Sequence, residues 1–426
     1  MINCFIPFLS LPQARQTVRA LGLCDRIKNI YLLATEKIPD EVEGCEMLMI
    51  DSPASTATFR TIALHADTAY TLLYTKYTAF EPGQFAFERL LAIAGDTNAG
   101  MLYADRYLLK NGNSQQAPVI DYQKGSLRDD FDFGSLLFFR SSVLKQAVRA
   151  MDADYRFAGL YDLRLRVSEL AELVHVNEYL YSEVETDIRK SGEKLFDYVD
   201  PKNRAVQIEM EAVCTAYLKR VGGYLAPDFE PVTFDAGGFE QEASVIIPVR
   251  NRIRTIEDAI RSVLAQKTTF RFNLIIVDNH STDGTSEAIG KYTADGRVVH
   301  LVPERSDLGI GGCWNVGVHH PACGKFAVQL DSDDVYSGPD TLQKIVDAFY
   351  EQNCAMVVGT YRMTDFKMNE IPPGIIDHRE WTLENGRNNA LRINGLGAPR
   401  AFYTPVLRRI NLPNTSYGED YALGLR

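Results

Sequence analysis

The sequence predicts an α/β protein with two domains, each built around a mostly parallel sheet. Three observations support this prediction. The chain has 426 residues, a length typical of two or three domains. Strand-like runs alternate with helix-like segments, as they do in βαβ units. The strand-like runs of the second half are continuously apolar, which is typical of strands buried on both faces of a parallel sheet.

Two strand-to-turn units open the second half. Residues 243–249 (ASVIIPV) form the first predicted strand, and the apolar residues of 255–266 recur at the spacing of a helix. Residues 273–277 (NLIIV) form the second predicted strand, which ends at Asp278 and a run of turn-forming residues. Ligands of open α/β sheets bind beyond the carboxyl ends of the strands. We therefore expect the polar residues after these strands to share one crevice.

A third predicted strand ends in three carboxylates within four residues, Asp331, Asp333 and Asp334. Neighbouring like charges repel, and burying them is costly unless a cation compensates. Mg²⁺ or Mn²⁺ suits such a site, because Mg²⁺ is held by one or two carboxylates while substrate phosphates and water complete its shell. Taken alone, the cluster is equally compatible with a solvated acidic turn.

Five segments occur in a defined order over residues 243–426: SVIIPVRNR, LIIVDNHSTDGT, DLGIGGCWNVGV, VQLDSDD and YGEDYALGLR. Together they resemble the motifs of the family 2 glycosyltransferases, whose nucleotide-binding domain has the GT-A fold. The resemblance implies a metal-dependent glycosyltransferase that builds a polysaccharide or cell-surface glycan. One catalytic base without a second, nucleophilic carboxylate implies a single displacement with inversion.

The resemblance also implies roles for individual residues. The residues expected to bind the nucleotide are Pro248, Val249, Arg250, Asn251, Asp278, Gly309, Asn315, Asp331 and Ser332. Asp331 and Asp333 would ligate Mn²⁺ or Mg²⁺, and Asp420 would be the catalytic base, assisted by Glu419. The expected donor is a nucleotide-diphosphate sugar, with a UDP-sugar preferred, and the expected acceptor is a glycan or a lipid-linked glycan.

Two positions depart from the family pattern. Arg250 stands where the family usually has an aromatic residue, and Trp314 stands where it usually has an arginine. Arg250 or Arg305 could supply the missing positive charge, and the sequence does not choose between them. Residues 394–402 form a Gly-rich loop that is either an acceptor platform or a connector.

The first half repeats the order of strands and helices but lacks the charged motifs. Thr75-Lys76-Tyr77 stands where the second half has its acid cluster, and only Asp162 matches the Glu-Asp position. We therefore expect three parts: a degenerate GT-A-like domain with a structural or acceptor-binding role, a helical linker and a GT-A domain. Their expected ranges are 1–195, 196–240 and 241–426.

The last of these domains is expected to be truncated, because only six residues follow Asp420 where the first half continues through a helix and a strand. On this interpretation the chain would bind donor but transfer sugar poorly.

Composition limits the partners and the compartment. A net charge of −11 and a pI near 5.3 argue against a general nucleic-acid surface. No apolar run approaches the roughly 18 residues of a membrane span. Seven scattered cysteines without C-x-x-C spacing predict free thiols in a reducing cytosol. We expect a cytoplasmic protein, and peripheral association with the inner membrane stays open.

Two other functions remain as alternatives. A nucleotidyltransferase would usually have a Gly-rich phosphate loop with a basic residue after the first strand, and residues 248–252 contain no glycine. A non-catalytic nucleotide-sugar-binding or scaffold protein would not need the acid cluster or Glu419-Asp420.

Overall fold

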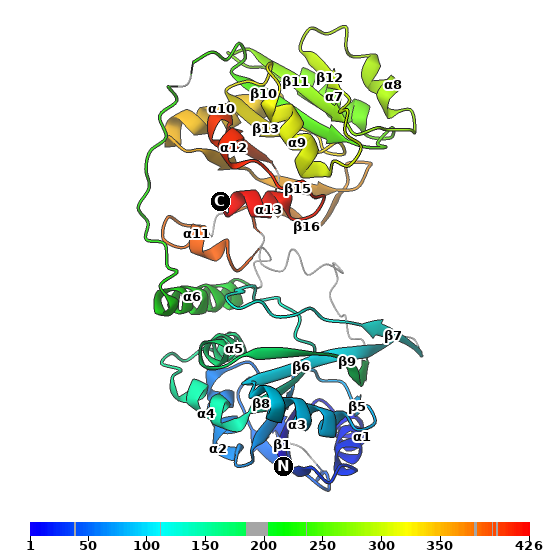
Figure 1. Cartoon of the computed structure of the whole chain (residues 1–426), viewed down its shortest axis with the longest axis vertical. Helices are drawn as coiled ribbons and strands as arrows, with labels where there is room; N and C mark the ends of the chain where they lie inside the picture. Colours follow the sequence, from blue (N-terminus) through cyan, green and yellow to red (C-terminus); the bar gives the residue numbers. More distant parts are fainter. Residues whose placement is uncertain are drawn as a thin grey trace. The chain divides into compact units, whose positions relative to one another are not determined.

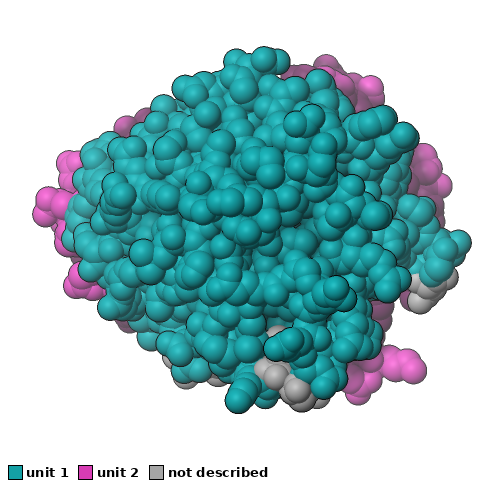
Figure 2. All heavy atoms as spheres, turned by 90° about the horizontal axis from the view of Figure 1, so that it is seen from below, with its two compact units in different colours: residues 1–224 teal, residues 225–426 magenta. Residues whose placement is uncertain are grey.

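A computed structural model describes residues 1–37, 40–110, 112–184, 203–235, 237–378, 381–393, 395–397 and 399–426. The chain divides into two compact units, unit 1 (residues 1–224) and unit 2 (residues 225–426), which Figures 1 and 2 show. The boundary falls inside the predicted linker 196–240. Residues 196–202 and Ala236 of that linker lie outside the described residues, as do Asn394 and Ala398 of the predicted acceptor loop.

Unit 1 is a mixed α/β unit. Its elements are β1 (Ile2–Pro7), α1 (Leu11–Gly22), β2 (Ile27–Ala34), β3 (Glu46–Met49), α2 (Thr56–His65), β4 (Tyr70–Tyr74), β5 (Phe80–Pro82), α3 (Ala86–Thr97), β6 (Met101–Lys110), β7 (Asn113–Ala117), β8 (Leu136–Arg140), α4 (Ser141–Arg149), α5 (Gly159–Leu170), β9 (Leu173–Val184) and α6 (Arg204–Val221). In the described residues the strands form one sheet in the order β3-β2-β1-β4-β8-β6-β9-β5, and β7 pairs with β6.

The central strands of unit 1 are buried on both faces. Successive side chains of a strand point to opposite faces, so β1 contributes to two cores. Cys4 and Ile6 lie in one core with α1 and α3, and Phe5 lies in the other with α2, α4 and α5.

Helix α6 is anchored to unit 1. The carboxylate of Glu209 on α6 accepts hydrogen bonds from the backbone N–H groups of Arg156 (3.1 Å), Phe157 (2.6 Å) and Ala158 (3.1 Å). These groups precede the first turn of α5, where backbone N–H groups have no partner within the helix. Part of the predicted linker is therefore integrated into unit 1.

Unit 2 is also mixed α/β. Its elements are β10 (Ala243–Val249), α7 (Ile256–Leu264), β11 (Phe272–Asp278), α8 (Thr285–Gly290), β12 (Val298–Leu301), α9 (Ile310–His319), β13 (Phe326–Gln329), α10 (Thr341–Gln352), β14 (Met356–Val358), β15 (Tyr361–Thr364), β16 (Glu370–Ile376), α11 (Gly386–Asn389), β17 (Arg400–Tyr403), α12 (Thr404–Ile410) and α13 (Glu419–Gly424). In the described residues six strands form a sheet in the order β12-β11-β10-β13-β17-β14, and β15 and β16 form a separate hairpin.

The apolar runs that predicted buried strands are buried as expected. In β10, Val245 and Ile247 pack with α7 and α10, while Ile246 packs on the opposite face against α9 and α12. Trp314 on α9 is 3% exposed and belongs to this second core. Its indole is therefore a packing group. No helix in the described part of the chain has the length and apolarity needed to cross a bilayer.

The two sheets share one topology over six strands. In unit 1 the order β3-β2-β1-β4 is parallel, and β8 and β6 follow antiparallel to β4 and β8 respectively. In unit 2 the order β12-β11-β10-β13 is parallel, and β17 and β14 follow in the same antiparallel manner. This match is consistent with a degenerate first copy of the fold, which stays a prediction.

Candidate functional site

The loops after β10 and β11 form one wall of the candidate site. Both strands are parallel and end side by side, with Val249 opposite Asp278. The backbone N–H of Asn251 donates to Ser281 Oγ (3.0 Å), and Asn251 Oδ1 accepts from the N–H of Thr282 (2.8 Å). Asn251 has a left-handed backbone (φ 55°), which asparagine tolerates better than most residues. The amide of this predicted nucleotide ligand thus shapes the loop.

Asp278 is buried at the end of β11 and organises the turn that follows. Its carboxylate accepts hydrogen bonds from the Ser281 backbone N–H (3.0 Å) and the Ser286 hydroxyl, and it lies 3.4 Å from His300 Nε2. Burial acts to raise the pKa of Asp278, but the hydrogen bonds from Ser286, Ser281 and His300 outweigh burial and lower the pKa below its ordinary value. Asp278 is therefore ionised at neutral pH and holds the loop in place.

The acid cluster lies just beyond β13. Burial raises the pKa of Asp331, and the nearby charges of Asp333 and Asp420 add to this effect, while Arg400 and a hydrogen bond from Gln329 oppose it. Burial raises the pKa of the Asp334 carboxyl to about 6, and the charges of Asp331 and Asp333 add to this effect. Part of the residue is nevertheless exposed to solvent. Such excess negative charge is what a bound cation would relieve.

Asp333, the other predicted metal ligand, is more accessible. Its side chain is 45% exposed, and Oδ2 lies 3.6 Å from Nε of Arg252. A pocket of about 340 Å³ lies beside it, lined by residues 251–255, Asp283, Asp333 and Phe366. The pocket is therefore formed by the segments that follow β10, β11 and β13, together with the turn of the β15–β16 hairpin.

Arg400 is a site residue that sequence reasoning missed. It begins β17, which runs antiparallel to β13, and its side chain is 5% exposed. Nη1 donates to Asp420 Oδ2 (2.6 Å) and Nε donates to Gln329 Oε1 (2.6 Å). Gln329 in turn donates to Asp331 Oδ1 (3.3 Å). A buried guanidinium thus connects the predicted base with the strand that carries the predicted metal ligands.

Glu419 and Asp420 begin α13. Glu419 is 7% exposed, and its Oε2 has no hydrogen-bond partner among the described residues. Burial raises the pKa of Glu419, and the charges of Asp420 and Asp331 add to this effect, while Arg400 and a backbone N–H oppose it. The backbone N–H of Tyr421 donates to Asp420 Oδ1 (2.7 Å). The structure therefore brings both predicted catalytic carboxylates within electrostatic reach of Asp331.

Hydrogen bonds and close packing hold the segment before Asp420 against helix α9. Asn315 Nδ2 donates to the Leu412 carbonyl (2.8 Å), and the Leu412 N–H donates to Asn315 Oδ1 (3.0 Å). The N–H of Gly309 donates to Asn414 Oδ1 (2.9 Å). A Cβ at Gly311 would lie 2.0 Å from the Pro413 carbonyl oxygen. Gly309 and Asn315 thus serve packing here, and their predicted contact with a nucleotide stays a prediction.

The remaining predicted nucleotide ligands lie along the same edge of the sheet. Pro248 and Val249 end β10, Arg250 is exposed directly after it, and Ser332 is buried between the carboxylates of the acid cluster. Arg305, the alternative to Arg250 as a source of positive charge, is paired with Asp307 (Nη2–Oδ2 2.7 Å). Because this pair is exposed, it does not decide between Arg250 and Arg305 as the source of positive charge.

At the corresponding edge of the sheet in unit 1, the charged side chains form ion pairs with one another. Lys76, after β4, pairs with the fully buried Glu183 (Nζ–Oε1 2.5 Å), and Arg106 Nε lies 2.9 Å from the same oxygen. Asp162, at the Glu-Asp position, is 1% exposed and accepts from Arg166 Nε (2.9 Å). Both groups are engaged within the unit.

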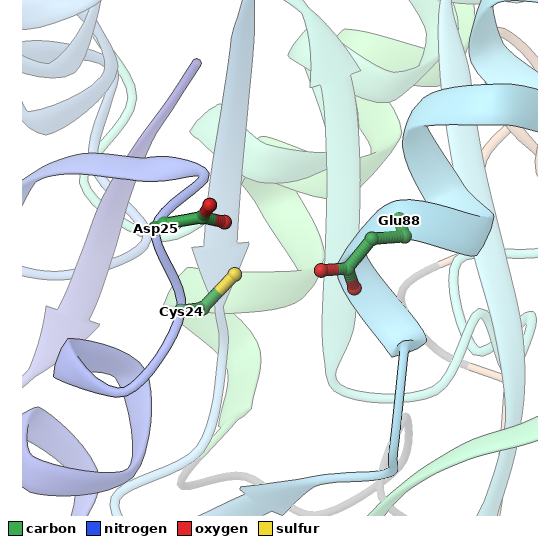
Figure 3. Close-up of side chains that lie close together, drawn as sticks. All are labelled: Cys24, Asp25 and Glu88. Atoms are coloured by element: carbon green, nitrogen blue, oxygen red, sulfur yellow. The ribbon is translucent and has the colours of Figure 1, made fainter.

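One other group in unit 1 has three potential metal-ligand atoms close together. Cys24 and Asp25, in the loop after α1, face Glu88 of α3, and the three ligand atoms lie within 4.8 Å of one another (Figure 3). It is the one such group found in the described ranges, so the acid cluster after β13 is not a preformed three-carboxylate cage. Asp25 is exposed and lies 3.4 Å from Arg26, and none of the three is at a strand's carboxyl end. This group receives no assignment.

With this geometry established, known proteins were compared with the chain. Residues 244–409 match the model of the family described as glycosyl transferase family 2. These residues form a family 2 glycosyltransferase domain. The match covers the loops after β10, β11 and β13 and includes Arg400, while Glu419 and Asp420 lie beyond it.

Curated relatives resemble this family 2 domain over part of their length. The putative teichuronic acid biosynthesis glycosyltransferase TuaG of Bacillus subtilis is 33% identical over 120 residues, which cover 28% of this chain and 46% of TuaG. The uncharacterized glycosyltransferase RC0461 of Rickettsia conorii is 38% identical over 97 residues, which cover 23% of this chain and 15% of that protein. The chain thus spans less than half the length of these curated relatives.

Among solved structures, S. aureus TarS residues 1-349 is 25% identical, with coverage of 42% of this chain and 53% of that one and a TM-score of 0.35.

Proposed function

We propose that the family 2 domain transfers a sugar from a nucleotide-diphosphate donor to a glycan or lipid-linked acceptor. The observation that carries this proposal is the convergence of Asp331, Arg400 and Asp420 at the carboxyl edge of the sheet within a family 2 domain. A UDP-sugar is the preferred donor. The name of TuaG, with its reference to teichuronic acid biosynthesis, supports a product at the cell surface.

Asp331 and Asp333 would hold a divalent cation, Mn²⁺ or Mg²⁺. Their hard carboxylate oxygens suit either ion. Burial raises the pKa of Asp331, and the negative charges of Asp333 and Asp420 add to this effect, so a cation here would favour the ionised carboxylate. When bound, the cation supplies charge neutralisation for the departing diphosphate. Asp278 supports the nucleotide side indirectly, because it fixes the turn that forms one wall of the crevice.

Asp420 would accept the proton of the acceptor hydroxyl as general base. Arg400 and the Tyr421 N–H each contact one of its oxygens, so the carboxylate is held in one orientation. Each oxygen keeps a further lone pair for the hydroxyl proton. With one base and no second nucleophilic carboxylate, the reaction would be a single displacement that inverts the anomeric carbon.

We place this reaction in the cytoplasm. All seven cysteines are free thiols, as is usual in a reducing compartment. Fractionation of cells that produce the chain would test this location, with peripheral attachment to the inner membrane detected as release by high salt.

Calorimetric titration of UDP and GDP, with and without Mn²⁺, tests the proposed donor site. We expect metal-dependent binding that Asp333→Ala removes, while Asp278→Ala weakens nucleotide binding with or without metal. Asp347→Ala, an exposed carboxylate on α10 outside the site, should bind like the wild type. Unchanged affinity of Asp333→Ala in the presence of a chelator would overturn the assignment. Nucleotide binding without any sugar transfer would favour the non-catalytic alternative.

A further inference from the structure

The pocket beside the acid cluster combines two arginines with two carboxylates in different roles. Asp283 accepts hydrogen bonds from the backbone N–H groups of Ile253 (3.2 Å) and Thr285 (3.1 Å), so it is committed to loop structure. Asp333 has Arg252 as its ion-pair partner. The carboxylate predicted to ligate the metal is therefore in contact with a cation of the chain itself.

Arg252 combines a fixed backbone with a lightly held guanidinium. Its N–H donates to Thr285 Oγ1 (2.8 Å), which ties its backbone to the start of α8. Among the residues that the structure describes, the polar contacts of the guanidinium are with the Asn251 carbonyl (Nη1–O 3.3 Å) and Asp333 (3.6 Å), and half of the side chain is exposed. Exposed ion pairs contribute about 0–1 kcal/mol, so this contact is easily given up.

Arg254, the other arginine of the pocket, is held differently. Its guanidinium lies over the Phe366 ring, 5.6 Å from the centroid. Trp314, where a phosphate-binding arginine would be expected, is buried in the core. Arg252 is thus the arginine of this pocket whose guanidinium lies against a predicted metal ligand.

A divalent cation at Asp333 would compete with Arg252 for the same carboxylate. A nucleotide diphosphate entering with that cation brings phosphate oxygens, which the forked guanidinium binds strongly. We propose that Arg252 is a positioning residue that exchanges Asp333 for the diphosphate of the donor when metal and nucleotide bind. This inference rests on the proposed function of the domain.

The test measures metal and nucleotide binding separately. Free Mn²⁺ is followed by electron paramagnetic resonance, and UDP and GDP are titrated calorimetrically in the presence of Mn²⁺. We expect Arg252→Gln to bind Mn²⁺ alone about two- to fivefold more tightly, because Asp333 loses its competing partner. The same variant should bind the nucleotide about tenfold more weakly, because a charge-assisted contact to phosphate is lost.

Two further variants keep the result interpretable. Arg252→Lys retains the charge without the forked geometry and should recover part of the nucleotide affinity. Arg261→Gln removes a similarly exposed arginine that pairs with Asp258 on α7 (2.8 Å), and it should change neither affinity. A variant that merely disturbs the loop would lose both affinities together.

The inference therefore requires that Arg252→Gln binds Mn²⁺ more tightly and the nucleotide more weakly than the wild type. If both affinities fall or neither changes in Arg252→Gln while the wild type binds normally, the inference is wrong and the proposed function stands. If the wild type binds neither nucleotide with Mn²⁺, the proposed function fails and the inference fails with it.

Discussion

At the scale of single residues, Asp420 is the group whose removal separates chemistry from binding. Asp420→Asn keeps the size and the contact with Arg400 but removes the basic oxygen. A general base contributes about 10²–10⁴-fold to rate, so kcat should fall by that factor while donor affinity stays within about twofold. Steady-state release of the nucleotide product, together with donor titration, measures both. Wild-type turnover in this variant would show that Asp420 is not the base.

Arg400 should matter for stability as well as for catalysis. Arg400→Met leaves Asp420 without its cation and Gln329 Oε1 without its donor in a buried setting. Breaking one side of a buried ion pair costs about 3 kcal/mol or more, so the free energy of unfolding should fall by about that amount. Arg305→Met breaks an exposed pair and should cost less than about 1 kcal/mol. Equal losses in urea unfolding would contradict the central role of Arg400.

The lowered pKa of Asp278 predicts that its contribution to the stability of the fold is lost in acid. Its pKa is lower in the folded protein than in the unfolded chain, so the stabilisation is present above the unfolded pKa of about 3.9. It is lost as the pH falls through the lower, folded pKa. The difference in Tm between the wild type and Asp278→Asn should therefore stay nearly constant above about pH 5 and shrink as the pH falls below about 4. A difference that does not vary with pH would argue against an ionised Asp278.

At the scale of elements, the start of α9 determines how closely the segment before Asp420 can approach. A Cβ at Gly311 would collide with the backbone at Pro413, whereas a Cβ at Gly290, the last residue of α8, would meet nothing within 4 Å. Overpacking typically costs about 1–3 kcal/mol, so Gly311→Ala should lower the Tm and, by moving residues 412–420, reduce transfer. Gly290→Ala should be neutral or stabilising. Normal activity in Gly311→Ala would show that the contact between the start of α9 and residues 412–420 does not position the base.

Much of this edge of the sheet follows from local sequence. The apolar runs before Arg250, Asp278 and Asp331 predict buried parallel strands, and parallel strands place their carboxyl ends together. Arg400 and Asp420 could not be paired in this way. Their contact depends on β17 running antiparallel to β13, and no local pattern in the sequence specifies that pairing.

The contacts of Arg252 and Asn315 also could not be predicted from the sequence. Motif position predicts that Asn251 and Asn315 bind the nucleotide, and this stays a prediction. In the structure their amides form hydrogen bonds with neighbouring segments of the chain. The arginine against Asp333 lies one residue past Asn251, and the sequence gives no reason to single it out. Side-chain direction in a loop is set by hydrogen bonds that residue order alone does not reveal.

At the scale of the whole molecule, two sheets of similar topology carry different charged groups at corresponding strand ends. The Lys76–Glu183 ion pair follows β4 in unit 1, whereas the carboxylates that follow β13 in unit 2 are compensated only in part, by Arg252 and Arg400. We predict a single metal-dependent nucleotide site per chain, because the positive charge of Lys76 would repel a metal cation at the corresponding position of unit 1. Calorimetry of the full chain should give a stoichiometry near one, and Asp333→Ala should remove all of it. A residual metal-dependent site in that variant would place a second site in unit 1.

The shared order of six strands also bears on how the chain reaches its native state. During synthesis, the strands of unit 1 emerge first and can complete their sheet before β10 is available. Tandem copies of one topology risk domain swapping, in which a strand joins the wrong copy. The central strands INCFIP and ASVIIPV differ in side-chain size at most positions, so each fits its own pair of cores better than the other's. Divergence between the two units would therefore protect the chain from misassembly.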